Sequence, residues 1–150
     1  MKLLHTMDKV LAAFGNIRAM ERIHVDTYTE GLISKIEGSK IAESDYGQLF
    51  VVFQDLAGYE FMNTTILSGT NIKTFKGCDL VFSCGDRKVI LVSDTKEIES
   101  DFSNVSNRWL TKISFVISSE DKDMIINKQF EKVDLNFKKK SLPLLNSEIQ

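Results

Sequence analysis

Between residues 76 and 118, short runs of β-branched and aromatic residues alternate with residues typical of turns. The runs are Cys78–Cys84, Arg87–Ser93, Glu97–Phe102 and Arg108–Ile117. Gly85 and Asp86 separate the first two runs, and residues 94–96 separate the second from the third, with side chains that favour tight turns. Valine, isoleucine and phenylalanine fit the pleated, half-buried surface of a sheet. The pattern therefore predicts four consecutive strands.

Single glycines recur before and within this region. They stand at positions 47, 58, 69, 77 and 85. Isolated glycines at such intervals between β-rich runs are typical of successive hairpin turns. We expect a first hairpin of residues 48–54 and 59–67, and a short further strand at residues 72–75. Residues 47–140 as a whole are then expected to form an antiparallel β meander.

An apolar stripe with helical spacing precedes the strands. Its residues are Leu3, Met7, Val10, Phe14 and Ile17. The 4-3-4-3 spacing places these side chains along one face of a helix. The stripe either packs on the sheet of its own chain or pairs with a second copy, because a heptad-like spacing serves both purposes.

Residues 21–46 carry two competing patterns. An alternation typical of a strand is formed by Ile23, Val25 and Thr27. The apolar spacing that follows Thr29 instead favours a short helix that ends near Gly38. We expect an extended piece and then a helix, so that residues 1–46 form a helical or mixed N-terminal part.

The end of the chain predicts one more helix and one more strand. Ser118 is suited to cap a helix, and the acids Glu120 and Asp121 stabilise its first turn. The strand that follows is indicated by the apolar alternation of Val133, Leu135 and Phe137. Residues 141–150 include the single proline, Pro143, and are expected to form an irregular tail.

These elements predict an α+β fold. We expect an antiparallel sheet or sandwich of about 7–8 strands, with an N-terminal amphipathic helix and a short helix before the last strand. A chain of 150 residues, 43% of them hydrophobic, is suited to a single domain spanning residues 1–150 with one core.

Charge and hydropathy limit the partners. The net charge of −2 argues against nucleic acid, because proteins that bind it carry a basic excess. The apolar run at the N-terminus breaks at His5, and no stretch approaches the 18 or so apolar residues of a membrane span. We therefore expect a cytoplasmic protein.

The sequence predicts no catalytic residue, metal site or cofactor. His5 and His24 lack the spacing of a zinc motif, and no glycine-rich phosphate loop occurs. Cys78 and Cys84 fall on one predicted strand, roughly 20 Å apart, which is too far for a disulfide. Both are expected to be free, buried thiols.

Two segments have opposite charge. Residues 94–101 hold four acids and one lysine, and residues 128–140 hold five lysines and two acids. We expect these segments to face each other, either as neighbouring strands or across an oligomer interface, where the charges select the register. Lys138–Lys140 are expected to guard an exposed strand edge.

Arg108 and Trp109 are the candidate binding residues, because arginine and tryptophan are enriched in interface hot spots. Trp109 is also in phase with Ile113 and Phe115, which favours a place in the core. We expect a non-catalytic binding or adaptor module that acts through protein contacts, with a protein partner or by self-association through the N-terminal helix. The alternative is a small-molecule-binding protein or an enzyme whose pocket is assembled from residues distant in sequence.

Overall fold

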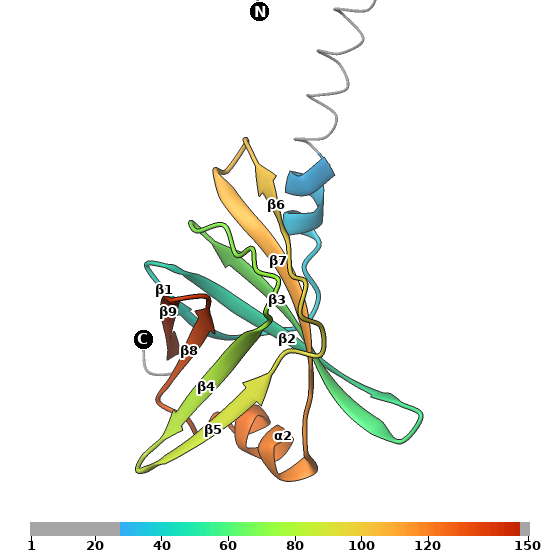
Figure 1. Ribbon diagram of the computed structural model, residues 1–150, viewed down its shortest axis with the longest axis vertical. Coiled ribbons are helices and arrows are strands. Elements are labelled where there is room, and N and C mark those ends of the chain that lie inside the picture. The colour runs from blue at the N-terminus through green and yellow to red at the C-terminus, as the bar shows by residue number, and fades with distance from the viewer. Residues whose placement is uncertain (1–27, 148–150) are drawn as a thin grey trace, which may run out of the picture.

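In the computed structural model, which describes residues 28–147, one antiparallel sheet curls into a half-barrel (Figure 1). Its nine strands are β1 (Ser39–Ser44), β2 (Gly47–Leu56), β3 (Tyr59–Ser68), β4 (Cys78–Cys84), β5 (Arg87–Val92), β6 (Ser100–Ser103), β7 (Arg108–Val116), β8 (Lys132–Phe137) and β9 (Lys140–Asn146). Residues 28–34 are helical, and helix α2 spans Ser119–Ile126. The α+β class and the antiparallel sheet are therefore confirmed, with more strands than predicted.

The strand order is β5-β4-β8-β9-β1-β2-β3-β7-β6. Adjacent strands of the chain pair as predicted in β2–β3, β4–β5 and β6–β7. Strands β8 and β9 also pair, although no strand was predicted after β8. The pairs β3–β7, β4–β8 and β1–β9 instead join distant segments, so the predicted meander is wrong at this level. Turn residues specify which neighbouring runs fold back on each other, but they carry no information about which hairpins become neighbours.

The two ends of the sheet both reach β7. Strand β6 pairs with the first half of β7, over Arg108–Thr111. The end of β5 meets the second half, where Ser93 and Phe115 form a bridge and the Asp94 N–H donates to the Ser114 carbonyl at 2.8 Å. The curl therefore closes along a short seam between β5 and β7.

The main core fills the inside of the curl. Its largest fully buried side chains include Phe82, Phe115, Leu49 and Met62. Phe82 meets the Phe130 ring edge-on at a centroid distance of 5.1 Å. Helix α2, capped by Ser118 as predicted, adds Met124 and Ile125 to this core. The interior is thus occupied by the protein's own side chains.

Strand β1 was not predicted, because a β-bulge hides its pattern. Lys40 pairs with Phe50 and Ala42 with Leu49, so Ile41 is the extra residue. Ile41 and Ala42 are both buried, although they are consecutive. A bulge breaks the period of two on which a strand prediction depends. The helix predicted in this region is present but ends earlier, at residue 34.

The prediction of an irregular tail is wrong, because residues 140–146 form β9 between β8 and β1. Pro143 pairs with Asp134, yet its carbonyl accepts a hydrogen bond from the Ser44 hydroxyl at 2.7 Å. The Pro143 nitrogen and oxygen therefore face β1, whose ladder with β9 has already ended at Glu43 and Leu145. The missing N–H of the proline costs no ladder bond there.

The other local predictions have mixed outcomes. The predicted strands at residues 78–84, 87–93 and 108–117 and the last strand are confirmed to within a residue or two. The runs at residues 72–75 and 97–102 give only the Thr74–Ile98 bridge and the short β6. Both cysteines are free, as predicted, but only Cys78 is buried, and Cys84 is half-buried. The stripe from Leu3 to Ile17 lies outside the described residues, as does the alternation at residues 23–27.

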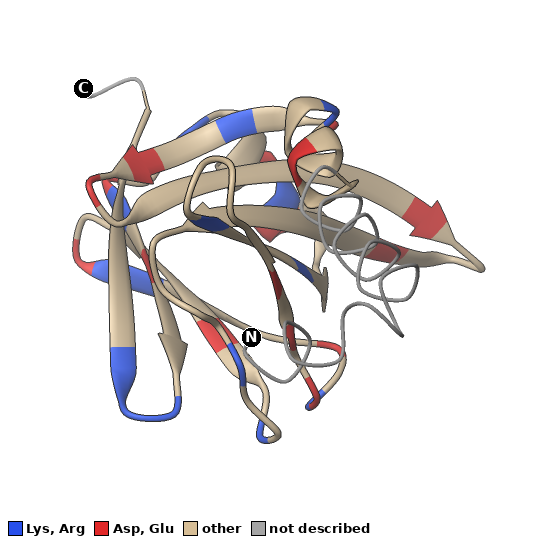
Figure 2. Ribbon diagram, turned by 90° about the horizontal axis from the view of Figure 1, so that it is seen from above, with Lys and Arg blue, Asp and Glu red and all other residues tan. Residues whose placement is uncertain are grey.

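The charge pairing predicted between neighbouring strands is wrong. The basic segment supplies β8, which pairs with β4 and β9, whereas the acidic segment leads into β6, which pairs with β7. Figure 2 shows acidic and basic residues interspersed over most of the ribbon. Pairing of these segments across an oligomer interface stays a prediction.

Strand β9 offers a test of its place in the sheet. Leu144 is 2% exposed, and its neighbour Leu145 is 46% exposed. We expect Leu144→Ala to lower the free energy of unfolding by about 2–5 kcal/mol, because it leaves a cavity in the core. Leu145→Ala is the matched control and should change it by less than about 0.5 kcal/mol. Urea unfolding measures both, and equal effects would contradict the placement of β9.

Candidate functional site

A second apolar cluster lies on the outer face of the sheet. Ile33, in the helical residues 28–34, packs on Leu67 of β3 and Leu110 of β7. The cluster is flanked by Leu32, Ile36 and Phe50. This packing holds residues 28–37 against the outside of the curl, where they form a wall that stands above β2, β3 and β7.

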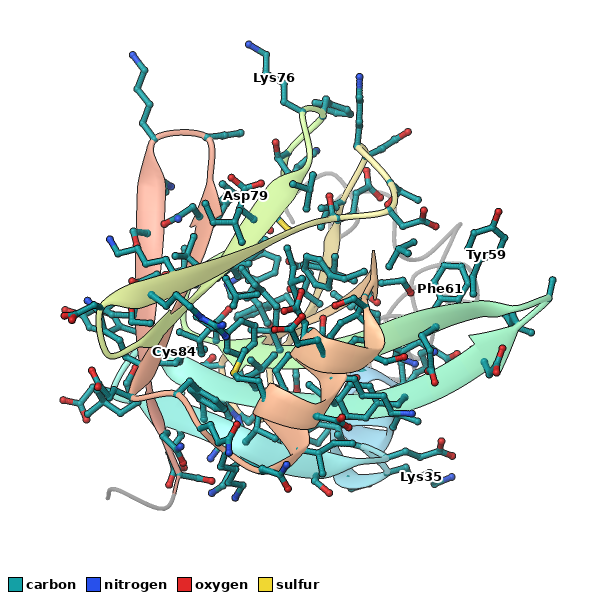
Figure 3. The ribbon with its side chains drawn as sticks, turned by 90° about the horizontal axis from the view of Figure 1, so that it is seen from below. Lys35, Tyr59, Phe61, Lys76, Asp79 and Cys84 are labelled. Carbon is teal, nitrogen blue, oxygen red and sulfur yellow. The ribbon has the colours of Figure 1, made fainter. Side chains whose placement is uncertain are left out.

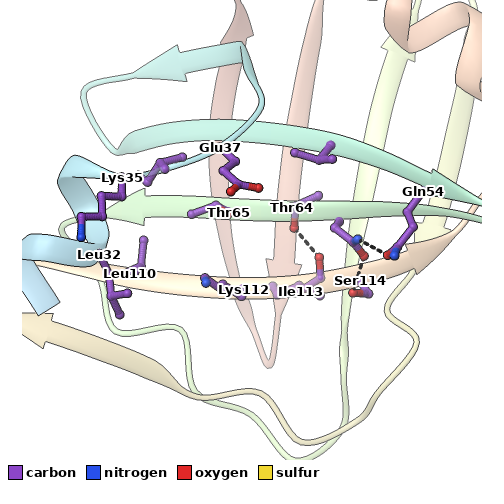
Figure 4. A pocket seen from close by; sticks show the side chains of 13 residues that line it. Leu32, Lys35, Glu37, Gln54, Thr64, Thr65, Leu110, Lys112, Ile113 and Ser114 are labelled. Carbon is purple, nitrogen blue, oxygen red and sulfur yellow. Dashed lines mark hydrogen bonds between the residues drawn. The ribbon is translucent and has the colours of Figure 1, made fainter. Parts of the chain in front are cut away.

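A groove of about 580 Å³ runs beside this wall (Figure 4). Its lining comes from residues 32–37 and from the three strands. The residues are Leu32, Lys35, Ile36, Glu37, Val52, Gln54, Asn63, Thr64, Thr65, Leu110, Lys112, Ile113 and Ser114. Apolar side chains thus lie next to the helix, and most of the polar ones lie on the strands. We call this site the outer groove.

Three side chains form a hydrogen-bonded row across the floor of the outer groove. The Ser114 hydroxyl donates to Asn63 Oδ1 at 2.8 Å, and Asn63 Nδ2 donates to Gln54 Oε1 at 2.9 Å. The strand register brings them together, because Asn63 lies opposite Ser114. The row leaves the Gln54 amide with both N–H groups and Asn63 with one N–H for a ligand.

The charged residues of the outer groove are available as well. Lys35, Glu37 and Lys112 are exposed, and none of their three side chains has a hydrogen bond or ion pair to another residue of the described chain. The positive charge of the two lysines and the spare amide N–H groups together exceed the negative charge of the single carboxylate of Glu37. The outer groove is therefore suited to a ligand rich in hydrogen-bond acceptors, such as carboxylate or carbonyl groups.

Glu30 fastens the wall to the turn between β6 and β7. Its Oε2 accepts hydrogen bonds from the Ser103 hydroxyl at 2.6 Å and from the Ser106 hydroxyl at 2.8 Å. These two bonds, with a smaller effect of the Arg108 charge, lower the pKa of Glu30. The carboxylate is thus a fixed anchor for the helical residues 28–34.

The predicted binding residues Arg108 and Trp109 do not share a site. Arg108 lines a second groove of about 430 Å³ on the other side of the helical residues, together with Glu30 and Phe50. Trp109 follows it in the strand and points to the opposite face, where its ring lies 4.7 Å from that of Phe102. The position of Trp109 in the strand alternation predicted a place in the core, but the side chain is only half-buried.

The cysteines and histidines are the remaining candidate groups. Burial raises the pKa of Cys78 to about 12 and also raises the pKa of Cys84, so both are thiols at neutral pH. Within residues 28–147, no group of three His, Cys, Asp or Glu side chains is arranged to hold a metal ion. His5 and His24 lie outside the described residues.

The residues of the outer groove were missed from the sequence. Gln54, Asn63 and Ser114 belong to three different runs, and each is an ordinary polar residue on a solvent-facing strand position. The sequence shows that these residues alternate with buried neighbours. It does not show that they lie close together, because that depends on the pairing of β3 with β7. No local signal specifies that pairing.

Two general results complete the site. No helix in the described part of the chain combines the length and hydrophobicity needed to cross a bilayer. Comparison of the chain with known protein families, with curated proteins and with solved structures found no match.

The Glu30 anchor predicts a pH-dependent stability. Because the folded-state pKa of Glu30 lies below its ordinary 4.5, its stabilising effect is complete above that value and is lost as the pH falls through the lowered pKa. The difference in free energy of unfolding between wild type and Glu30→Gln should therefore be largest at neutral pH and shrink on acidification. Urea unfolding at a series of pH values measures it.

A companion variant shows whether the serine bonds cause this effect. In the Glu30→Gln background, Ser106→Ala should not alter the pH dependence any further, because the titrating carboxylate is already absent. A wild-type minus Glu30→Gln difference that stays constant with pH would show that Glu30 is not an anchor.

Proposed function

We propose that this protein is a non-catalytic binding module, and that its outer groove holds a short segment of a partner protein that carries carboxylate groups. The observation that supports the proposal is the hydrogen-bonded row of Gln54, Asn63 and Ser114 beside two lysines whose side chains have no partner among residues 28–147. The row fixes these side chains before any ligand arrives. Fixed polar groups lose little conformational entropy on binding.

The shape of the outer groove suits a polypeptide. Its wall offers the apolar side chains Leu32 and Ile36, and its floor offers amide and hydroxyl groups. An extended segment presents alternate side chains to opposite sides, so an apolar residue can face the wall while its neighbours face the strands. Peptide carbonyl groups accept hydrogen bonds from the spare amide N–H groups of Gln54 and Asn63.

Lys35 and Lys112 supply the charge preference. Both are solvent-exposed, so their main effect is expected on specificity and association rate, with a modest effect on affinity. Glu37 repels an acidic side chain placed beside it, so the acids of the ligand are expected to lie next to the two lysines. This combination favours a segment in which aspartate or glutamate lies next to an apolar residue.

A small acidic molecule is the second candidate ligand. The volume of the outer groove, about 580 Å³, is within the range of small-molecule sites. The packed interior of the curl argues against a carrier that encloses its ligand inside the sheet. A small ligand would then share the outer groove and its lysines with the peptide.

Peptide binding tests the proposal. We expect an array of heptapeptides, in which each position carries Glu, Gln, Lys or Leu, to select peptides with glutamate beside leucine. Fluorescence anisotropy of a selected peptide should show binding that Lys112→Glu weakens by about tenfold, because the reversed charge repels the ligand.

The matched control is Lys139→Glu, the same charge change at an exposed position in the turn between β8 and β9. It should leave peptide affinity within about twofold at physiological salt, where charges far apart are screened. Selection of peptides without acids, or equal losses in both variants, would contradict the proposal. Binding of citrate that depends on Lys112, without peptide binding, would favour the small-molecule candidate.

A further inference from the structure

The second groove, of about 430 Å³, has a different chemistry from the outer groove. The wall contributes part of its lining, and strands β2, β3 and β7 contribute the rest. Among residues 28–147, Arg108 is the only cation that lines it, and Glu30 is the only acid. The other lining residues that bear on a ligand are Ile36, Gln48 and Phe50.

Arg108 lies on the outer face of β7. Because side chains alternate along a strand, it shares this face with Leu110 and Lys112. Arg108 is half-buried, and its side chain has no hydrogen bond or ion pair to another residue of the described chain. A guanidinium offers five N–H donors, and burial without a partner is unfavourable for a charged group. Arg108 is therefore suited to an anion from outside the chain.

Glu30 limits the charge of that anion. It lies near enough for the Arg108 charge to contribute to its lowered pKa, yet no ion pair joins the two side chains. The Glu30 Oε2 instead accepts hydrogen bonds from the hydroxyls of Ser103 and Ser106. The Glu30 carboxylate is thus held beside the groove, where it repels a dianion more strongly than a monoanion. One cation next to one carboxylate favours a ligand with a single negative charge.

Phe50 and Ile36 give the groove an apolar side. Both are half-buried and pack against the outer cluster of Ile33, Leu67 and Leu110. Part of their surface stays open to the groove. A ligand that covers this surface removes apolar area from water, which favours binding of an apolar chain. The volume of about 430 Å³ is within the range of small-molecule sites.

We propose that this groove, which we call the arginine groove, binds a small monocarboxylate with a short apolar chain. The carboxylate accepts two N–H groups of Arg108 in the bidentate arrangement that guanidinium and carboxylate favour, and the chain lies on Phe50 and Ile36. Gln48 adds a donor, because its Nε2 donates to Glu43 Oε2 at 3.3 Å and has a second N–H for the ligand. This proposal goes beyond the outer groove and does not depend on it.

The two grooves use different cations. Lys35 and Lys112 line the outer groove, whereas Arg108 lines the arginine groove. Figure 3 shows Lys35 at the edge of the molecule, directed away from the packed interior of the curl. Ile36 is the only residue that both linings share. A change of one cation therefore tests one groove at a time.

NMR titration of the isotope-labelled full chain with hexanoate tests the proposal. We expect saturable shifts of the backbone amide signals of Gln48, Phe50 and Arg108. Hexanol has a chain of the same length without the charge, and it should bind at least about tenfold more weakly. Hexyl phosphate is close to a dianion at neutral pH, and it should also bind more weakly than hexanoate.

Variants assign the binding to Arg108. Arg108→Gln should weaken hexanoate binding by about tenfold. Arg108→Lys should have an intermediate affinity, because an ammonium group lacks the planar fork that holds both carboxylate oxygens. The matched control is Lys112→Gln, which removes a cation from the outer groove and should leave the affinity for hexanoate within about twofold at physiological salt.

Three results would overturn the proposal. The first is the absence of saturable shifts with hexanoate, and the second is binding of hexanol or hexyl phosphate as tight as that of hexanoate. Both are measured on the wild type, so they do not depend on the folding of a variant. The third is an equal loss of hexanoate affinity in Arg108→Gln and Lys112→Gln, which would assign the carboxylate to the outer groove.

Discussion

Packing of apolar side chains inside the curled sheet decides which surfaces this protein has available. The inner face of every long strand is turned to one core, and helix α2 contributes Met124 and Ile125 to it. Because that interior is full, the outward positions of the strands are left to make contacts. The outer groove consists of such positions, on strands whose opposite faces are anchored in the core. Their geometry is rigid for that reason, and a rigid surface loses little entropy when it binds.

The register between β3 and β7 places the outer groove. The same ladder that sets Asn63 opposite Ser114 sets Phe61 opposite Val116, two residues further along. A slip of β7 by one residue along this ladder would turn Ser114 and Val116 to the inside and bring its buried side chains out. The register is in turn fixed by the core, since Met62 and Phe115 are a buried pair within it. The energy of the core therefore determines the position of polar groups that do not belong to it.

Most of the hairpins could be predicted from the sequence, because their information is local. Gly85 marks the turn between β4 and β5, and the turn at Ala57 and Gly58 has both residues at positive φ, as a two-residue hairpin requires. Strands β1 and β9 were not predicted, because each departs from the local pattern of a strand for a reason that lies elsewhere in the fold. Ile41 is a bulge residue, and Pro143 faces a gap in the ladder between β9 and β1. The outer groove was beyond prediction, because Gln54, Asn63 and Ser114 have no shared pattern until β3 pairs with β7.

The short seam leaves part of the sheet edge without a strand partner. Strands β5 and β7 share only a bridge and one neighbouring hydrogen bond, so much of the β5 edge is left without a strand partner. Exposed strand edges are sites of association that proteins usually protect with charge. Here Lys88 is the charged residue next to Ile90 and Val92, and it protects one end only.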